Sequence, residues 1–230
     1  MEYNTINEAI NSFQEINYLY SSTVDSKVVE NYLRNINDKF HEYFLPENDI
    51  LKPGKMNQMV TLTSILYDHM EAKTILGNDE GLLSFTESYE IREFFLRFLK
   101  HFDSLNLYQA LDLLNGYYKK VVLPALRKNK KAGVYHHEAD EQFFDEVSDL
   151  IFDFPLLEHL DFVFVDFLPK MTLQEIIHVM YVFTRCNYRG NLLIDKFSSK
   201  YFEFLRDSGK KRLVDDKKTL LKLTWVACKA

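Results

Sequence analysis

Histidine and carboxylate side chains gather at one place in the sequence, at His136, His137, Glu138, Asp140 and Glu141. If a helix begins there, His137 and Glu141 lie four residues apart on one face, as two metal ligands would. No His-Glu-x-x-His motif, paired cysteines or matching second cluster accompanies them. Acidic residues in the first turn also complement the helix dipole. We therefore expect a helix start here and no metal or other cofactor, with His137 and Glu141 as the candidate ligands if a metal is bound.

Cys186 is the thiol best placed for nucleophilic catalysis, because it has arginine neighbours and follows His178 by eight residues. On a helix that rises 1.5 Å per residue, this spacing puts about 12 Å between His178 and Cys186, too far for a hydrogen-bonded pair. The sequence also lacks Gly-x-Ser-x-Gly and the glycine-rich loops that bind phosphate. We predict that the protein is not an enzyme and that Cys186 is a buried structural residue.

Charge is spread unevenly along the 230 residues, whose formal net charge is −6. Residues 1–195 carry −12, and positions 132–169 hold ten acidic residues, no lysine or arginine, and many phenylalanines. A solvated acidic face over a phenylalanine core explains this pattern, and so does a docking surface that attracts a basic protein. The predicted partner-binding residues are Glu138, Asp140, Glu141, Asp145, Glu146, Asp149, Phe152 and Phe154.

The C-terminal 35 residues have the opposite charge, since ten Lys/Arg and four Asp/Glu give residues 196–230 a charge of +6. The basic patch predicted to contact phosphate consists of Lys210, Lys211, Arg212, Lys217 and Lys218. A solvated helix end that balances the acidic remainder of the chain explains these residues equally well.

Apolar residues recur at helical spacing in several segments that begin alike. Thr5, Asn106 and Thr172 are each followed three residues later by Glu or Gln, which is the pattern of a capping box at a helix start. A weaker copy begins near Lys55, so the four starts are 50, 51 and 66 residues apart. Residues 162–165 (Phe-Val-Phe-Val) have the composition of a strand, but a single strand would have no partner, and we predict a helix there.

A second amphipathic stretch follows most of these helices, and the chain has only 7 Gly and 5 Pro to break them. We predict an all-α fold of stacked helical hairpins, similar to an α-solenoid, with about ten or eleven helices. A compact helical bundle is the alternative. The predicted single domain, 1–230, has hairpins near 5–40, 55–100, 105–128, 138–168 and 172–206 and a basic C-terminal helix over 213–229.

The most apolar stretch, 152–169, is interrupted by acidic residues, so we expect no membrane span. The sequence starts with polar residues rather than a secretory signal, and Cys186 and Cys228 form no disulfide framework. We therefore expect an intracellular, reducing compartment.

The segment from Met171 to Phe183, with the sequence MTLQEIIHVMYVF, continues through Asn187-Tyr188 and Leu192-Leu193. Over residues 171–206 it resembles the helical repeats of organellar RNA-binding proteins, the heptatricopeptide and RAP-associated repeats. The resemblance implies an α-solenoid in a mitochondrion, in place of the cytoplasm that the composition alone would indicate, either binding RNA or serving as a structural subunit.

RNA-binding repeats need a basic groove to meet phosphate, and the charge of −12 over residues 1–195 departs from that pattern. We therefore predict a non-catalytic scaffold that binds other proteins as an accessory subunit of a larger hetero-oligomeric assembly. Two alternatives stay open: an organellar RNA-binding protein that uses its basic C-terminal segment, and an acidic decoy or immunity-type protein that occupies the basic groove of a partner.

Overall fold

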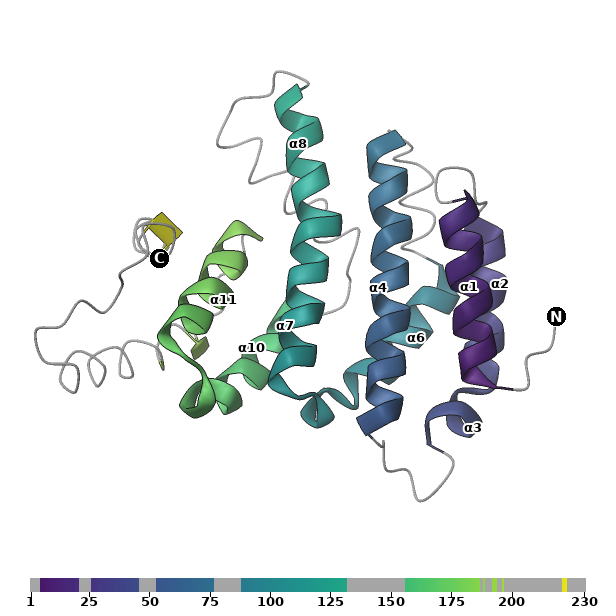
Figure 1. The fold of residues 1–230 in the computed structure, drawn as a ribbon, viewed down its shortest axis with the longest axis horizontal. Helices are drawn as coiled ribbons and strands as arrows, with labels where there is room; N and C mark the ends of the chain where they lie inside the picture. Colours follow the sequence, from purple (N-terminus) through teal and green to yellow (C-terminus); the bar gives the residue numbers. More distant parts are fainter. Residues whose placement is uncertain are drawn as a thin grey trace, which may run out of the picture. The chain divides into compact units, whose positions relative to one another are not determined.

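The computed structural model describes residues 5–20, 26–45, 53–76, 88–131 and 156–186, with the short pieces 188, 192–193, 196 and 221–222. All regular elements in these ranges are helical, which confirms the predicted all-α class (Figure 1). The α-helices are α1 (Ile6–Tyr20), α2 (Ser26–Asp38), α3 (Phe40–Phe44), α4 (Pro53–Leu76), α6 (Tyr89–Leu99), α7 (Leu107–Gly116), α8 (Leu123–Lys131), α10 (Leu156–Phe167) and α11 (Leu173–Arg185). The 3-10 turns η1 (Phe102–Ser104) and η3 (Leu168–Lys170) and the π-helical segment η2 (Tyr117–Val122) complete them.

Segments α7, η2 and α8 form one continuous helix, so the described ranges contain eight helices. The larger count of ten or eleven remains a prediction. So do the hairpin near 138–168 as a whole and the helix over 213–229, because residues 132–155 and nearly all of 197–230 lie outside the described ranges.

The predicted capping boxes are present at the starts of α7 and α11. The Asn106 side chain accepts a hydrogen bond from the Gln109 backbone at 3.0 Å, and the Gln109 side chain accepts one from the Asn106 backbone at 2.8 Å. Thr172 and Glu175 exchange the same two bonds before α11. These side chains satisfy backbone N–H groups that have no partner inside the helix, which is why both helices begin where the sequence predicts.

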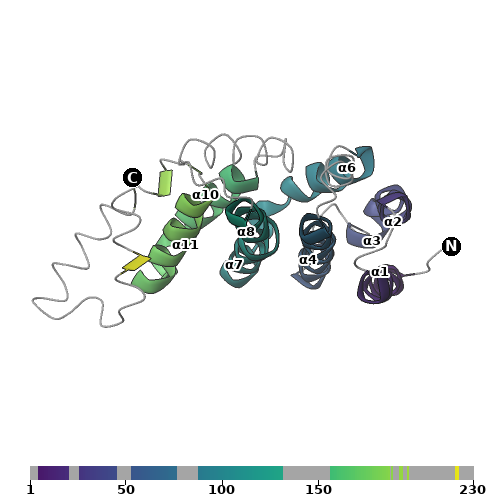
Figure 2. The same cartoon turned by 90° about the horizontal axis from the view of Figure 1, so that it is seen from above.

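The chain divides into two compact units, Met1–Pro155 and Leu156–Ala230, which are described separately. In the first unit α1 packs on α4, α4 packs on the α7–η2–α8 helix, and α2 packs on α6. Seen from above, α1, α4 and α7–α8 form one row, and α2 and α6 lie in a second row beside it (Figure 2).

Neighbouring helices of the first row run parallel and in register. The Gln58 side chain donates to Asn7 at 2.6 Å, and the Gln109 side chain donates to Asn57 at 2.6 Å, so the first turns of α1 and α7 both meet the second turn of α4. These bonded pairs are 51 and 52 residues apart in the chain. The contacts therefore have nearly the spacing of 50 and 51 residues at which the sequence pattern recurs.

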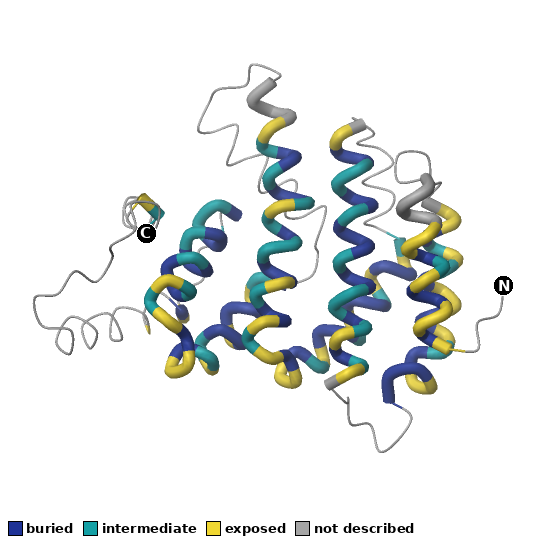
Figure 3. The backbone as a smooth tube through the Cα atoms, in the orientation of Figure 1, coloured by how far each residue is buried: buried dark blue, intermediate teal, exposed yellow. Residues whose placement is uncertain are grey.

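Helix α4 lies at the centre of the first unit, between α1 and the α7–η2–α8 helix, and is buried along most of its length (Figure 3). Phenylalanine fills the remaining core, where the fully buried members are Phe13, Phe44, Phe94, Phe95 and Phe98. The aromatic residues of α6 contact one another, with the rings of Phe94 and Phe95 5.6 Å apart. Burial of large side chains by neighbouring helices is the main source of stability for helices of this length.

The π-helical segment η2 lets the third long helix continue past Pro124. A proline inside a helix has no N–H to donate, and its ring collides with the carbonyl four residues earlier. Just before it, the backbone N–H of Leu123 donates to the carbonyl of Tyr118, five residues back. We attribute the wider turn to this proline, since π-turns relieve such a clash.

The second unit contains α10, η3 and α11. Helix α10 includes residues 162–165, as predicted from the lack of a partner strand, and Val163 and Phe164 are buried in it. The Phe164 ring meets Phe183 of α11 edge-on, at 6.1 Å between centroids. Among the described helices of both units, none combines the length and the apolarity needed to cross a bilayer.

Candidate functional site

The predicted partner-binding residues, which form an acidic and aromatic surface between Glu138 and Phe154, lie outside the described residues, which end at 131 and resume at 156. The same holds for the basic patch of 210–218 and for the two candidate metal ligands, His137 and Glu141. All three therefore stay predictions. In the described ranges, no group of three or more His, Cys, Asp or Glu side chains is arranged to hold a metal ion. The polar clusters that the structure does show lie between helices of the first unit and at the edge of α11.

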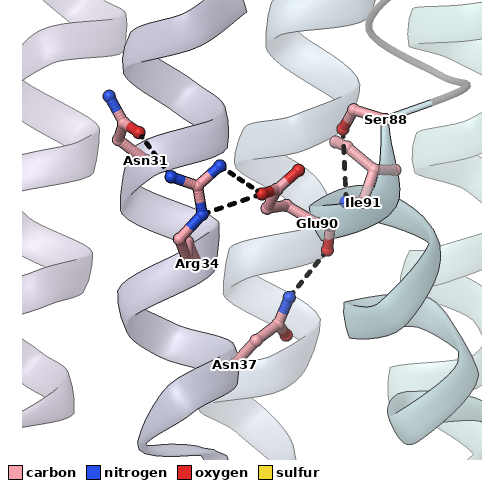
Figure 4. A network of polar contacts seen from close by, with 6 residues as sticks. All are labelled: Asn31, Arg34, Asn37, Ser88, Glu90 and Ile91. Carbon is pink, nitrogen blue, oxygen red and sulfur yellow. Dashed lines mark hydrogen bonds and ion pairs between the residues drawn. The ribbon is translucent and has the colours of Figure 1, made fainter.

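The first cluster, which we call the arginine seam, joins α2 to α6 through Arg34, Asn37, Glu90 and Arg97. Figure 4 shows the first three of these residues. Both Nε and Nη2 of Arg34 donate to Oε1 of Glu90, the Nε bond measuring 2.9 Å. The carboxylate raises the pKa of the Arg34 guanidinium, first by hydrogen bonding and then by charge attraction. The Arg34 guanidinium therefore lies at the N-terminal turn of α6, where it pairs with the Glu90 carboxylate.

Backbone groups complete the arginine seam. The Asn37 side chain donates to the carbonyl of Glu90 at 2.8 Å, and Arg97 donates to the carbonyl of Asn37 at 2.6 Å. The Arg97 guanidinium also lies 5.4 Å from the ring centre of Phe40 and pairs with Glu93 one turn earlier at 2.6 Å. The C-terminal half of α2 is thus bonded to residues near both ends of α6.

The second cluster, the lysine seam, joins η2 to α4 through Ser64, Asp68 and Lys120. The Lys120 ammonium lies 3.0 Å from the Ser64 hydroxyl and 2.6 Å from the Asp68 carboxylate. Beside it, burial and the Asp68 charge raise the pKa of Glu71, while Lys120 and Arg127 partly offset that rise. The seam therefore collects two acids of α4 opposite two basic residues of the α7–η2–α8 helix.

A serine next to a lysine is also the arrangement of a Ser–Lys catalytic pair, in which a neutral amine takes the proton of the hydroxyl. In the lysine seam the Asp68 carboxylate contacts the same ammonium at 2.6 Å. A charged ammonium donates hydrogen bonds and accepts no proton. Ser64 lies in the middle of α4, where the backbone N–H groups are used by the helix. The geometry therefore favours a role in holding the helices together.

His69 lies on α4, one turn before the buried Lys73, and is itself completely buried. Burial lowers the pKa of His69 to about 4, and the positive charge of Lys73 acts in the same direction. The imidazole is therefore neutral at physiological pH. Among the described helices of the first unit, α4 therefore carries the most polar side chains inside the fold.

Asp161 is the main polar group inside the second unit, where it is 1% exposed. Its carboxylate accepts a hydrogen bond from the Leu193 backbone at 3.1 Å and one from the Tyr188 hydroxyl at 3.3 Å. Burial raises the pKa of Asp161, and the two hydrogen bonds oppose the rise. Asp161 thus ties the segment after α11 back onto α10.

The two candidate catalytic residues are His178 on α11 and Cys186 directly after it, and the neighbours of both indicate a structural role. Cys186 is buried, as predicted, and burial raises the pKa of its thiol, which keeps it protonated. His178 meets Lys222 from the C-terminal segment, with 2.8 Å between Nδ1 and Nζ. Because a lysine ammonium can only donate, the imidazole nitrogen accepts this bond. Lys222 also lies over the Tyr181 ring, at 5.5 Å from its centre.

No protein-family model, no curated protein and no solved structure matches the chain.

Both seams were missed by reasoning from the sequence. The residues of each pair are 56 positions apart, for Arg34 with Glu90 and for Lys120 with Ser64. The signal that was available is the recurrence of the helix starts at 50 and 51 residues. If parallel stacking is assumed, opposite charges near that separation on matching turns become candidate pairs.

Proposed function

We propose that the protein is a non-catalytic helical-repeat scaffold that binds other proteins as an accessory subunit of a larger assembly. The observation that carries the proposal is the register between helices, in which side chains 51 and 52 residues apart form hydrogen bonds near the N-terminal ends of neighbouring helices. Parallel stacking of successive hairpins is how α-solenoids bury the apolar faces of each repeat. Such stacks present extended surfaces, and partner binding is their common use.

The use of polar groups supports the same proposal. Arg34, Asn37 and Lys120 each connect one helix to another rather than line a site with open coordination. We extend the proposal to a mitochondrial location on the resemblance of residues 171–206 to organellar repeats, which fluorescence microscopy of the tagged chain in its own cell tests directly.

The test is whether the chain is part of a stable complex in its native cell. We expect the tagged full chain to elute from a size-exclusion column far above its own 27.3 kDa, together with a constant set of proteins. Replacing Asp145, Glu146 and Asp149 by lysine should remove a basic partner, because the replaced side chains would repel it.

A control with the same change in charge uses the exposed residues Glu42, Asp103 and Asp112, each replaced by lysine. This control should leave the complex intact. Elution of the unmodified chain as a monomer from its native cell would contradict the scaffold proposal, and equal loss of partners from both triple variants would contradict the acidic surface.

RNA binding is a second candidate because residues 196–230 carry a charge of +6. Gel shifts with single-stranded RNA, titrated with salt, decide between the two. Binding that weakens steeply with salt, and that is lost on replacing Lys210, Lys211 and Arg212 by glutamate, would favour RNA. Binding that is absent at low salt would remove this candidate.

A further inference from the structure

Lys222, near the C-terminal end of the second unit, meets two side chains of α11. Its Nζ lies 2.8 Å from Nδ1 of His178 and 5.5 Å from the centre of the Tyr181 ring. His178 and Tyr181 are three residues apart, so they share one face of the helix. All three side chains are half-buried. We call these three residues the histidine clasp.

The position of one proton decides whether His178 and Lys222 attract or repel each other. A lysine amine ordinarily keeps its proton up to about pH 10.4 and an imidazole only up to about pH 6.5, so at pH 7.5 the ammonium is charged and the imidazole neutral. The ammonium then donates to Nδ1, and the ring hydrogen is on Nε2. In acid the imidazole takes up a proton at Nδ1, which then has no lone pair to accept the bond. Two positive charges are left in contact.

The Tyr181 ring cannot hold Lys222 against this repulsion. An aromatic ring attracts an ammonium through its negative face, and near a protein surface this attraction is several times weaker than the repulsion of two unit charges in contact. Loss of the bond to His178 therefore outweighs the contact with the ring.

The other charges of α11 do not compensate a protonated His178. Arg185 follows it by seven residues on the same face, about 10 Å along the helix, and adds positive charge. Glu175 is the acid of α11, and its carboxylate accepts bonds from the Thr172 backbone at 2.7 Å and from the Thr172 hydroxyl at 2.8 Å. Its charge is thus used in the capping box.

Helix α10 and η3 bring their charges to a different side of α11. The ring of Phe164 on α10 meets Phe183, which follows His178 by five residues and so lies about 140° round the helix. The titratable and charged groups of these two elements are Glu158, His159, Asp161, Asp166 and Lys170. Lys222 is therefore the described charge that meets His178 from another element.

We propose that the histidine clasp is a pH-sensitive switch, in which the neutral imidazole of His178 holds Lys222 on α11 and the protonated imidazole releases it. The clasp is closed at pH 7.5 and opens as the pH falls below about 6.5, since the neighbouring ammonium disfavours a second positive charge. Contacts of histidine that change sign in this range are a common means of sensing acidity. The switch is independent of the scaffold function, because it forms within one chain.

Nuclear magnetic resonance of the full chain, labelled with ¹⁵N in histidine and ¹³C at the Cε of lysine, tests the switch. At pH 7.5 the ¹⁵N shifts of His178 should show a hydrogen on Nε2 alone, and the Cε protons of Lys222 should be shifted upfield by the Tyr181 ring. Both signals should change together between pH 7.5 and 5.5, and the upfield shift should be lost. His178→Gln and Lys222→Met assign the two signals.

Lys170 provides an internal control, because its ammonium lies 5.9 Å from the centre of the Phe167 ring and that contact is not mediated by a histidine. Its ring-shifted signal should stay the same at both pH values. In His178→Gln the glutamine oxygen can still accept the bond from Lys222 but takes up no proton, so Lys222 should keep its upfield shift at pH 5.5. The matched variant His159→Gln on α10 should respond to pH like the unmodified chain. Circular dichroism confirms that each variant keeps its fold.

Four results would overturn the switch. Lys222 has no upfield shift at pH 7.5, or it keeps that shift after His178 has become protonated. His178 stays neutral down to pH 5.5 while Lys222 remains in place. Lys222 loses its shift in acid equally in His178→Gln, which would mean that another group responds to the proton. Each of these outcomes leaves the scaffold function unaffected, since that is tested by complex formation in the native cell.

Discussion

Two seams hold neighbouring helices together in the first unit, and they are built from different cations. The arginine seam uses planar guanidinium groups that donate to a carboxylate and to a backbone carbonyl at once. The lysine seam uses one ammonium between a hydroxyl and a carboxylate. A guanidinium matches several acceptors in fixed directions, whereas an ammonium acts as a point charge that fits many arrangements.

The residues beneath the two seams differ as well. Under the arginine seam lie the buried phenylalanines of α6, among them Phe94 and Phe98. Beside the lysine seam, α4 buries His69 and Lys73. We infer that apolar packing fixes α6 against α2, while α4 depends more on the protonation of its polar groups. The predictions below test that difference, in order of expected effect.

Truncation of the core under the arginine seam should have the largest effect. Phe98 is fully buried, and its ring lies 5.0 Å from that of Phe102. Phe98→Ala removes those contacts and leaves a cavity, so we expect a loss of about 3–5 kcal/mol in the free energy of unfolding. Urea denaturation followed by circular dichroism measures it. As a control, Leu96→Ala on the exposed side of the same helix should cost far less, and equal costs would contradict the core position of Phe98.

The second prediction concerns pH and the inside of α4. The pKa of His69 is lowered to about 4, below the ordinary imidazole value of 6.5, so the unfolded chain binds the proton more readily than the folded chain. Stability is then complete above about pH 6.5 and falls as the pH drops toward 4, by up to about 3 kcal/mol. Urea midpoints measured between pH 7 and 4 test this.

Replacement of His69 by phenylalanine should flatten the pH dependence between pH 7 and 4. The matched replacement is His41→Gln on α3, where the imidazole is exposed. It should leave the slope as it is in the unmodified protein. An unchanged slope in the His69 variant would show that another group responds to the acid.

The third prediction compares the two seams directly by double-mutant cycles. We expect the larger coupling energy between Arg34 and Glu90, because the guanidinium makes two bonds to a largely buried carboxylate. Between Lys120 and Asp68, where the carboxylate is more exposed to water than Glu90 is, we expect about 0.5 kcal/mol. Single and double alanine variants, unfolded in urea at low and moderate salt, give both values. A larger coupling at the lysine seam would reverse our ranking.

The smallest effect should appear at Gly116 of α7, which lies against Tyr67 of α4. A Cβ added to Gly116 would lie 3.1 Å from Cδ2 of Tyr67. Alanine at this position gains up to about 1 kcal/mol of helix propensity, which the crowding should cancel. At Gly54 nothing lies within 4 Å of an added Cβ, so Gly54→Ala should stabilise the protein slightly. Thermal unfolding of both variants tests the contrast, and a gain at Gly116 equal to that at Gly54 would show that Tyr67 moves aside freely.

Local patterns in the sequence were sufficient to predict much of the fold. The boxes at Asn106 and Thr172 depend on residues three positions apart, and they start helices as expected. Helix was also correctly predicted over 162–165, because a strand needs a neighbour that the chain did not offer. In these cases the determining interactions are short-range, so the sequence displays them directly.

The seams and the π-helical turn could not be predicted in this way. Arg34 and Glu90 carry no local mark of their pairing, since the contact exists only once α2 and α6 have packed together. Pro124 can be read from the sequence, but the sequence does not show whether the helix breaks there or widens into a π-turn. Packing against α4 on both sides of the proline favours a continuous helix. The spacing of 66 residues before Thr172 spans the boundary between the two units, so that interval of the repeat stays a prediction.

The π-helical turn before Pro124 also sets the phase of everything that follows it. Each residue advances a helix by about 100°, so a turn that absorbs one surplus residue rotates all later side chains of the rod by that amount. Arg127, which offsets the raised pKa of Glu71 on α4, belongs to the rotated part. Removal of a single residue between 117 and 122 would therefore leave the present column of α8 side chains facing α4, whereas a change that made this turn a regular α-helix without a deletion would rotate α8 by about 100° and bring a different column to its neighbour.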